Sequence, residues 1–563
     1  MDRKKWMVTP RQRCDLEMLL VGGFYPLMGF LSRIDYESVL LQMRLANGLV
    51  WPIPITLDVD EQFAQTIKLG DEIILCDADH TVLAKMNIAD KWKPDKSLEA
   101  QTVFATVDIE HPGVNYLFHH AGTWYLGGTV ELVQQPKYYD FVEFRHTPAS
   151  LRQIFLQLGW ERIIGFQTRN PIHRAHFELT LKAAEKVSGH ILIHPVVGLT
   201  KLGDIDYFTR VRCYQKILHR YSTKKAFLSL LPLAMRMAGP REALWHAIIR
   251  KNYGCTHFIV GRNHAEPGRK NEAKSFYTAY EAQELASRYQ SEIGISILAF
   301  EEMSYMRERK QYCFASERKP NETALTVSGT ALRKALLADE PIPDWFSFPE
   351  IIEELRASYP PRYKRGFTLF FTGLSGAGKT TLAHALMSRL MSAGKRKLTL
   401  LDGDVIRKIL AGELGYSKSD RDLNIRRIGF VAAEITKMGG IAICAAIAPY
   451  AAARNENRQL ISQFGGYIKV YVATPLSICE KRDTKGLYAK ARCGEIKKLT
   501  GMDDPYEPPE HPEITIDTST ISIVDSVNII MEYLLANDYL RIPDKVVSFT
   551  REPLFQEEKR NQS

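Results

Sequence analysis

The stretch Gly373-Leu374-Ser375-Gly376-Ala377-Gly378-Lys379-Thr380-Thr381 fits the pattern GxxxxGK[ST] of a phosphate-binding loop. Residues 367–372 before it are typical of a buried strand, and leucines recur every fourth residue behind it, as in a helix. The glycines let backbone N–H groups turn toward phosphate oxygens, Lys379 can reach the β- and γ-phosphates, and Thr380 can ligate the Mg²⁺ that accompanies ATP. We therefore expect an ATP site here.

A second set of residues that could handle anions lies in Gln167-Thr168-Arg169-Asn170-Pro-Ile-His173-Arg-Ala-His176. This segment follows a predicted strand and enters a predicted helix, which is where open α/β sheets bind ligands. Arg169 offers a planar fork that can hold a tetrahedral oxyanion, and the i, i+3 histidines share one helix face. A histidine pair could also hold a metal, but no third ligand lies at metal-binding spacing, so we favour an anion.

The elements that position these residues follow from hydrophobic periodicity. Short apolar alternations interrupted by Pro, Gly and Asp predict a mainly β module before about residue 145. Strands at 162–166, 190–193, 257–260 and 295–300, with a helix at 175–187, then predict a parallel sheet covered by helices on both faces. Prolines near 341–361 mark a boundary at about 355–365, after which a second α/β unit runs to about 540.

We therefore predict an α/β multidomain protein. Its expected parts are a β-rich module (1–145), a catalytic domain with a short helical subdomain and linker (146–355), a second catalytic domain (356–545) and a polar tail (546–563). A length of 563 residues suits several cores, and 45% hydrophobic with 25% charged residues is ordinary for a soluble protein. Neither a signal peptide nor a membrane-spanning stretch is recognisable, so we expect a cytoplasmic protein without a membrane partner.

Cysteines and net charge exclude several classes of function. The eight cysteines form no CxxC pair, which argues against a disulfide framework and against a zinc site. The net charge of +9 comes from dispersed basic residues, several of them inside the phosphate-type motifs. Small polyanionic substrates explain this excess at least as well as nucleic acid, which we do not expect as a partner.

Further motifs in residues 1–350 give the chain a family resemblance. With Gln167–His176 they include Pro240-Arg-Glu-Ala, Gly261-Arg262-Asn263-His264-Ala265-Glu266-Pro-Gly268 and Val327-Ser-Gly-Thr-Ala-Leu-Arg333. Together they resemble ATP sulfurylases, which transfer the adenylyl group of ATP to sulfate. The resemblance implies an N-terminal PUA-like module and a Rossmann-like nucleotidylyltransferase domain.

The same resemblance implies roles for individual residues. The catalytic strip would be Thr168, Arg169 and Asn170, with His173 and His176 stabilising charge on the phosphates. Sulfate would be bound by Gln167, Arg169 and the backbone N–H of Ala265, while ATP would contact Gln167–Asn170, Gly261, Arg262, Asn263, His264 and Met303. The chain departs from the family at Asn263 and Glu266. Glu266 adds a negative charge beside Ala265, so it must point away or weaken sulfate binding.

The region after the phosphate loop resembles adenylyl-sulfate kinases over about residues 365–540. The motifs are Leu400-Leu-Asp402-Gly-Asp404, the basic segment 414–427, and residues 474–492 and 500–507, which suggest a mobile lid. The resemblance implies a P-loop kinase fold in which residues 373–381 hold ATP and Asp402 accepts the proton of the ribose 3′-hydroxyl. Adenylyl sulfate would be gripped by Asp402, Arg407, Tyr416, Arg421, Asn424, Ile447, Lys485 and Leu487.

These resemblances lead to one functional prediction and one alternative. We expect a bifunctional transferase that makes adenylyl sulfate from ATP and sulfate and then phosphorylates it, with Mg²⁺ but no tightly bound organic cofactor. Ala448 stands where many relatives have a serine, so transfer from ATP should be direct. The alternative is a C-terminal kinase-like regulatory domain, which the intact Lys379, Thr380 and Asp402 disfavour. Family resemblance also predicts a homo-oligomer.

Overall fold

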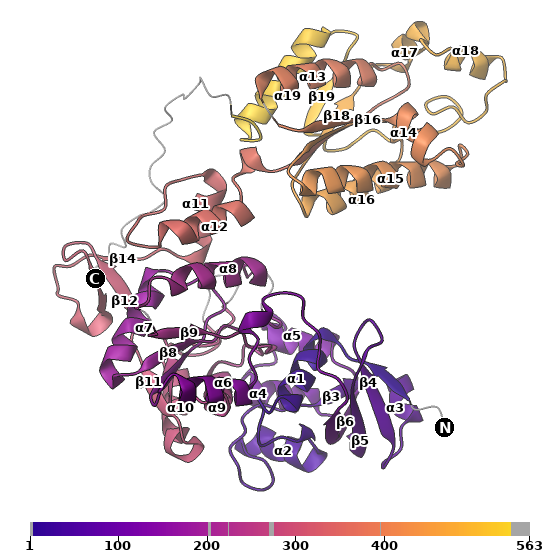
Figure 1. Cartoon of the computed structure of the whole chain (residues 1–563). Coiled ribbons are helices and arrows are strands. Elements are labelled where there is room, and N and C mark those ends of the chain that lie inside the picture. Colours follow the sequence, from indigo (N-terminus) through magenta and orange to yellow (C-terminus); the bar gives the residue numbers. More distant parts are fainter. Residues whose placement is uncertain (1–3, 201–203, 223, 269–274, 395, 542–563) are drawn as a thin grey trace. The chain divides into compact units, whose positions relative to one another are not determined.

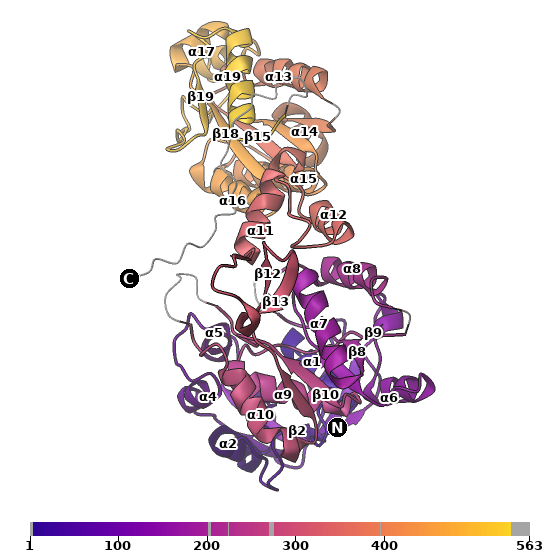
Figure 2. The same cartoon turned by 90° about the vertical axis from the view of Figure 1, so that its left-hand side faces the viewer.

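The computed structural model describes residues 4–200, 204–222, 224–268, 275–394 and 396–541. These residues form two compact units (Figures 1 and 2), one comprising the chain up to Ser328 with Ile342–Ser358, and the other comprising Gly329–Pro341 with residues 359–541. This division describes packing alone, so the domain boundaries expected from the sequence stay predictions, and the expected tail 546–563 lies outside the described residues. Within the described chain, no helix has the length and apolar character needed to cross a bilayer.

The N-terminal region of the first unit is built on a six-stranded sheet. Its strands run in the order β1 (Lys5–Met7), β4 (Glu72–Cys76), β5 (Val82–Trp92), β6 (Trp124–Leu132) and β2 (Gly29–Phe30), with β3 (Leu57–Val59) also pairing with β6. The sheet is the predicted β module. The alternation pattern does not indicate the helices that accompany it: α1 (Pro10–Leu20), α2 (Arg33–Gln42), α3 (Glu61–Thr66), α4 (Lys96–Val103) and α5 (Pro112–His119).

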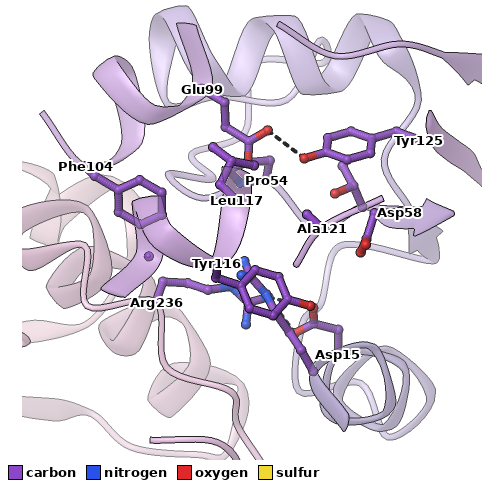
Figure 3. Close-up of a pocket in the computed structure, with 13 residues that line it drawn as sticks. Asp15, Pro54, Asp58, Glu99, Phe104, Tyr116, Leu117, Ala121, Tyr125 and Arg236 are labelled. Atoms are coloured by element: carbon purple, nitrogen blue, oxygen red, sulfur yellow. Dashed lines mark hydrogen bonds and ion pairs between the residues drawn. The ribbon is translucent and has the colours of Figure 1, made fainter. Parts of the chain in front are cut away.

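A buried polar cluster lies in this region (Figure 3). The Arg236 guanidinium pairs with both Asp15 carboxylate oxygens at 2.6 and 2.7 Å, and Glu99 accepts a hydrogen bond from Tyr125. Tyr36 donates a further hydrogen bond to Glu99. The cavity between them measures about 20 Å³, room for one water molecule. Since every one of these charges has a partner and no substrate-sized space adjoins them, the cluster belongs to the fold.

The second sheet of the first unit is entirely parallel. Its order is β11 (Ser296–Ala299), β10 (His257–Val260), β7 (Ile163–Phe166), β8 (His190–Ile193) and β9 (Ala226–Leu228), so four of its strands match predicted ones and β9 was missed. The strand order reverses between β7 and β10, and ligands of open α/β sheets bind at the carboxyl ends of strands at such a point. Its helices are α6 (Pro148–Gln157), α7 (Arg174–Val187), α8 (Tyr207–Leu218), α9 (Gly239–Asn252) and α10 (Glu281–Ile293).

A small antiparallel sheet and a helix complete the first unit. The sheet consists of β13 (Gln311–Phe314), β12 (Met303–Met306) and β14 (Ala324–Leu325), and the helix is α12 (Pro349–Ser358). Short 3₁₀ turns lie at Val142–Phe144 and Ala315–Glu317. Residues just before α12 contact the start of α7, where backbone N–H of Arg174 donates to Phe346 O at 3.1 Å. This contact brings a distant part of the sequence to the strip that contains the paired histidines.

The second unit is a five-stranded parallel sheet in the order β16 (Leu398–Asp402), β17 (Ile441–Ala445), β15 (Phe367–Thr372), β18 (Gly466–Val472) and β19 (Ile514–Ile516). Figure 1 shows α13 (Lys379–Ala393) and α19 (Ile523–Ala536) on one face and α15 (Lys418–Lys437) and α16 (Ala451–Ser462) on the other. Each face has its own apolar core. The remaining helices are α11 (Gly329–Ala338), α14 (Gly403–Leu410), α17 (Leu476–Arg482) and α18 (Leu487–Arg492), with a 3₁₀ turn at Arg362–Lys364.

Candidate functional site

The first candidate site lies where the strand order reverses, at the carboxyl ends of β7 and β10. Residues 167–173 follow β7, and residues 261–268 follow β10. The structure joins the two loops directly, because one Arg169 N–H group donates to the backbone oxygen of Glu266 at 3.2 Å. The two sulfurylase-like segments, about ninety residues apart in the sequence, therefore form one site.

Arg169 is held by protein partners on both sides of its guanidinium. Besides the bond to Glu266, its Nη1 lies 3.2 Å from a carboxylate oxygen of Asp204. The backbone around it is fixed from α8, since Arg210 donates to Arg169 O at 3.2 Å and Tyr214 donates to Asn170 O at 2.8 Å. No spacing in the sequence linked α8 to this strip, so these supporting residues were missed.

Two polar residues of the strip behave differently. The Thr168 hydroxyl both accepts from Asn170 N–H, at 3.0 Å, and donates to Asn170 O, at 2.9 Å, so it shapes the turn itself. The Gln167 side-chain oxygen is buried and has no hydrogen-bond partner among the described residues. A buried polar atom without a partner is costly, and a ligand hydrogen-bond donor would satisfy it.

Both histidines of the strip are neutral at physiological pH. His173 is the N-cap residue of α7; its Nδ1 lies 2.8 Å from Ser347 Oγ, and burial, with help from nearby His176, lowers its pKa to about 3. Burial also lowers the pKa of His176, whose Nδ1 is buried without a partner among the described residues. They can therefore stabilise phosphate charge as N–H dipoles, but they add no full positive charges.

The loop after β10 has an unusual backbone. Asn263 and Ala265 both adopt left-handed conformations, with φ of 54° and 56°, which are uncommon for residues that carry a side chain. Arg262 pairs with Glu302 at 2.6 Å, so the loop adjoins Met303, the first residue of β12. His264 Nε2 lies 3.0 Å from Nδ1 of His246 on α9.

Glu266, the departure from the family pattern, turns its carboxylate toward backbone N–H groups. Its two oxygens accept from Gly268, Phe276 and Tyr277, each at 3.3 Å. The carboxylate therefore points into its own loop, and the Arg169 fork meets the backbone oxygen of this residue instead.

The second candidate site is the phosphate loop between β15 and α13. Gly376 and Gly378 have φ of 74° and 98°, and a Cβ on Gly373 would lie 2.4 Å from Val472 O, so these positions require glycine. Lys379 donates to Gly373 O and Leu374 O at 2.9 and 2.7 Å. Burial, reinforced by the positive charge of Lys485, lowers the pKa of Lys379 to about 8, which leaves the side chain mostly charged at neutral pH.

Thr380 and Asp402 meet beside this loop. The Thr380 hydroxyl donates to Asp402 Oδ2 at 2.9 Å, and Asp402 also caps α14 by accepting from Asp404 N–H at 2.9 Å. Hydroxyl and carboxylate oxygens are suitable ligands for Mg²⁺, which favours a cation bound together with nucleotide phosphates at this point.

The cationic residues expected to bind adenylyl sulfate lie around the carboxyl end of the same sheet. Arg407 stacks 4.2 Å from the centre of the Tyr416 ring, and Arg421 donates to Tyr416 O at 3.0 Å. The Asn424 side-chain oxygen is buried and has no partner among the described residues. Lys485 pairs with Asp404, Leu487 begins α18, and Ile447 O accepts from Thr372 Oγ1 at 2.7 Å.

Comparisons with known proteins agree with this architecture. Residues 2–135 match the family model of the PUA-like domain, residues 142–358 that of ATP-sulfurylase and residues 365–517 that of adenylylsulphate kinase. The predicted fold class, a PUA-like module followed by an α/β sulfurylase domain and a P-loop kinase domain, is thereby confirmed.

Relatives match this chain over nearly its whole length. The chain is 49% identical over 525 residues to a sulfate adenylyltransferase of Phaeosphaeria nodorum (93% of this chain, 92% of that protein) and 48% identical over 540 residues to one of Mycosarcoma maydis (95% and 94%). It also resembles the solved structure of a hexameric APS kinase from Thiobacillus denitrificans, with a TM-score of 0.76 and 36% identity over 96% of this chain and 94% of that one. The chain therefore belongs to the sulfate adenylyltransferase family and is an enzyme with an ATP-sulfurylase domain followed by an adenylylsulphate kinase domain.

Proposed function

We propose that the chain makes 3′-phosphoadenylyl sulfate in two consecutive reactions. In the first, a sulfate oxygen attacks the α-phosphorus of ATP, the bond to the pyrophosphate oxygen breaks, and adenylyl sulfate forms. In the second, the ribose 3′-hydroxyl of adenylyl sulfate attacks the γ-phosphorus of another ATP, and its proton passes to Asp402. The observation that carries the second step is the complete set of Lys379, Thr380 and Asp402 at the phosphate loop.

For the first step we assign positioning and charge compensation to the strip after β7. Arg169 and Gln167 would hold sulfate with the N–H of Ala265, and the loop 261–264 with Met303 would hold ATP. His173 and His176, being neutral, would donate N–H groups to the phosphates. No side chain needs to act as nucleophile, because sulfate itself attacks, so catalysis rests on aligning two anions in a pre-formed site.

For the second step we assign residues 373–381 to ATP, Thr380 to its Mg²⁺ and Asp402 to the proton of the 3′-hydroxyl. Arg407, Tyr416, Arg421, Asn424 and Lys485 would grip adenylyl sulfate beside Ile447 and Leu487. Ala448 is buried and carries no hydroxyl, so direct transfer from ATP is the route that fits this chain.

A regulatory kinase-like domain is the alternative, and one observation favours it: the curated relatives at 48–49% identity are named only sulfate adenylyltransferase. The names do not exclude a second activity. The two hypotheses differ in what happens to adenylyl sulfate once it is made, which a product assay resolves.

The test follows both products from ATP, Mg²⁺ and sulfate with matched variants. The unmodified chain should yield the 3′-phosphorylated product. Lys379→Ala should accumulate adenylyl sulfate with the first rate retained, and Arg169→Ala should stop the first step while added adenylyl sulfate is still phosphorylated, each loss being on the order of 10²–10³-fold. Unphosphorylated adenylyl sulfate as sole product of the unmodified chain would rule out the second activity.

We also propose a homo-oligomer, supported by the similarity to the hexameric APS kinase. Sedimentation of the purified full-length chain at micromolar concentration tests this: a species of 64.1 kDa alone would contradict it.

A further inference from the structure

The polar side chains of Glu242, His246 and His264 contact one another in this order, and His264 belongs to the loop that we assign to ATP. Glu242 and His246 lie one turn apart on α9 and are fully buried. Glu242 Oε1 lies 3.3 Å from His246 Nε2, and His246 Nδ1 lies 3.0 Å from His264 Nε2. The first contact does not have hydrogen-bond geometry, and His246 Nε2 is buried without a hydrogen-bond partner among the described residues, so the carboxylate at 3.3 Å is the charge that acts on this nitrogen.

The carboxylate at the Glu242 end of these contacts is an acceptor. Glu242 lies in the first turn of α9 and accepts from the backbone N–H groups of Arg236 and Ala238 at 2.9 and 2.7 Å. Burial opposes ionisation, but the His246 contact and these two N–H groups outweigh it and lower the pKa of Glu242. The positive end of the helix dipole favours the same charge.

An ionised Glu242 fixes where the protons lie on both rings. Burial lowers the pKa of His246 and of His264, so each neutral ring carries a single N–H. The His246 nitrogen that faces the carboxylate must be the N–H, which leaves its Nδ1 as an acceptor. His264 must then donate from Nε2, and its Nδ1 becomes an acceptor without a partner among the described residues.

We propose that Glu242 and His246 are positioning residues that hold His264 in the Nε2–H tautomer, so that its Nδ1 accepts a hydrogen bond from the nucleoside part of ATP. Phosphate oxygens only accept hydrogen bonds, so this nitrogen would be repelled by them. The donors that ATP offers are the adenine N6 amino group and the ribose hydroxyls. This assignment rests on the proposed sulfurylase function, in which the loop 261–264 contacts ATP.

Nucleotide analogues that each lack one donor test the idea. The first reaction is measured with 2′-deoxy-ATP, 3′-deoxy-ATP and purine riboside triphosphate, in the unmodified chain and in His264→Phe and His246→Leu. One analogue should lose about tenfold in kcat/KM against ATP, the effect of one neutral hydrogen bond, in the unmodified chain. Both variants should be slower with ATP and should lose that discrimination.

His190→Gln is the matched control, because His190 stacks on Trp160 at the far end of a strand of the same sheet. It should keep both the rate and the discrimination. The proposal is overturned if no analogue is penalised in the unmodified chain, or if the same penalty persists in His264→Phe and His246→Leu.

A spectroscopic measurement keeps the proposal testable without turnover. In the ¹⁵N-histidine-labelled full chain, His264 should show a protonated Nε2 and an unprotonated Nδ1 throughout pH 6–8, and this signature should be lost in His246→Leu. A proton on Nδ1 would overturn the relay. Absence of adenylyl sulfate from the unmodified chain would instead reject the proposed function, so the two failures are distinguishable.

Discussion

In the first unit Arg169, His173 and His264 of the site contact protein partners, whereas in the second unit Lys485 of the site and its partner Asp404 lie in solvent. The Arg169 side chain is 21% exposed and pairs with Asp204, which is 14% exposed. Lys485 and its partner Asp404 are 51% and 64% exposed, and Tyr416 is 65% exposed. A half-buried pair is screened less by water and is held more firmly before substrate arrives, while an exposed pair exchanges partners easily.

The difference indicates two ways of handling anions. In the first site the polar and charged groups are already oriented in the folded protein, so they need little reorganisation when substrate binds. The second site has a phosphate loop fixed by its glycines and an exposed pair, Lys485 and Asp404, which must reorganise when ligand excludes water. Substitutions of buried charges in the first unit should therefore affect stability, whereas substitutions of exposed charges at the second site should affect turnover.

The largest expected effect contrasts one ion pair from each unit. Arg236 and Asp15 are 1% and 4% exposed, so Arg236→Met leaves a buried carboxylate unpaired and should cost about 3–5 kcal/mol of unfolding free energy. Arg426 and Glu456 are 50% and 48% exposed, and Arg426→Ala should leave the denaturation midpoint of its unit unchanged. Urea unfolding followed by probes in each unit measures both.

A double variant sharpens this contrast. Arg236→Met with Asp15→Leu removes both charges and should recover part of the loss, because the cost arises from the unpaired charge. Equal destabilisation by Arg236→Met and Arg426→Ala would remove the distinction between the two units.

The next effect is on turnover in the second unit. Asp402→Asn keeps an amide oxygen that can cap α14 but removes the carboxylate, so phosphorylation of adenylyl sulfate should fall on the order of 10²-fold or more with an unchanged melting temperature. Thr380→Ser, which keeps the hydroxyl that meets Asp402, is the control and should remain active. A large loss of stability in Asp402→Asn would show that the carboxylate serves the fold.

Sequence patterns found four of the five strands of the second sheet in the first unit, the phosphate loop and the order of the domains, because periodicity and glycine spacing are local signals. They could not find Asp204, Ser347 or His246, since each reaches the site only through tertiary packing. They placed the histidines at 173 and 176 beside the phosphates but could not tell their charge, because burial, which neutralises them, is invisible in spacing. The orientation of Glu266 was likewise beyond the sequence, since three backbone N–H groups decide it.

A pH titration tests the same comparison with a smaller effect. Burial lowers the pKa of His111 to about 4 and that of His173 to about 3, below the unfolded value of about 6.5. Below pH 6.5 these histidines are protonated in the unfolded chain but stay neutral in the folded one. Their contribution to the free energy of unfolding is therefore complete above pH 6.5 and decreases as the pH falls toward the folded pKa values. Each histidine should cost the first unit about 2 kcal/mol between pH 7 and 5.

The second unit provides the internal control for this titration. Its described histidines, His384 and His511, are exposed, so its unfolding midpoint should change less over the same range. In His111→Gln the loss of unfolding free energy of the first unit between pH 7 and 5 should be smaller by the contribution of one histidine, about 2 kcal/mol. Parallel loss of stability in both units would contradict a role for buried neutral histidines.

The smallest expected effect concerns Glu266, where the chain departs from its family. Because the carboxylate faces the N–H groups of Gly268, Phe276 and Tyr277, its charge is compensated within the loop. Glu266→Gln should therefore change the KM for sulfate by less than about threefold, within the range of a single weakened neutral contact. Glu301→Gln, an exposed glutamate beside the same sheet, is the matched control and should behave like the unmodified chain. A rise in sulfate affinity of tenfold or more in Glu266→Gln would mean that the Glu266 carboxylate repels sulfate. The charges of the first site would then be less completely oriented for the anion before binding than the protein contacts of the site indicate.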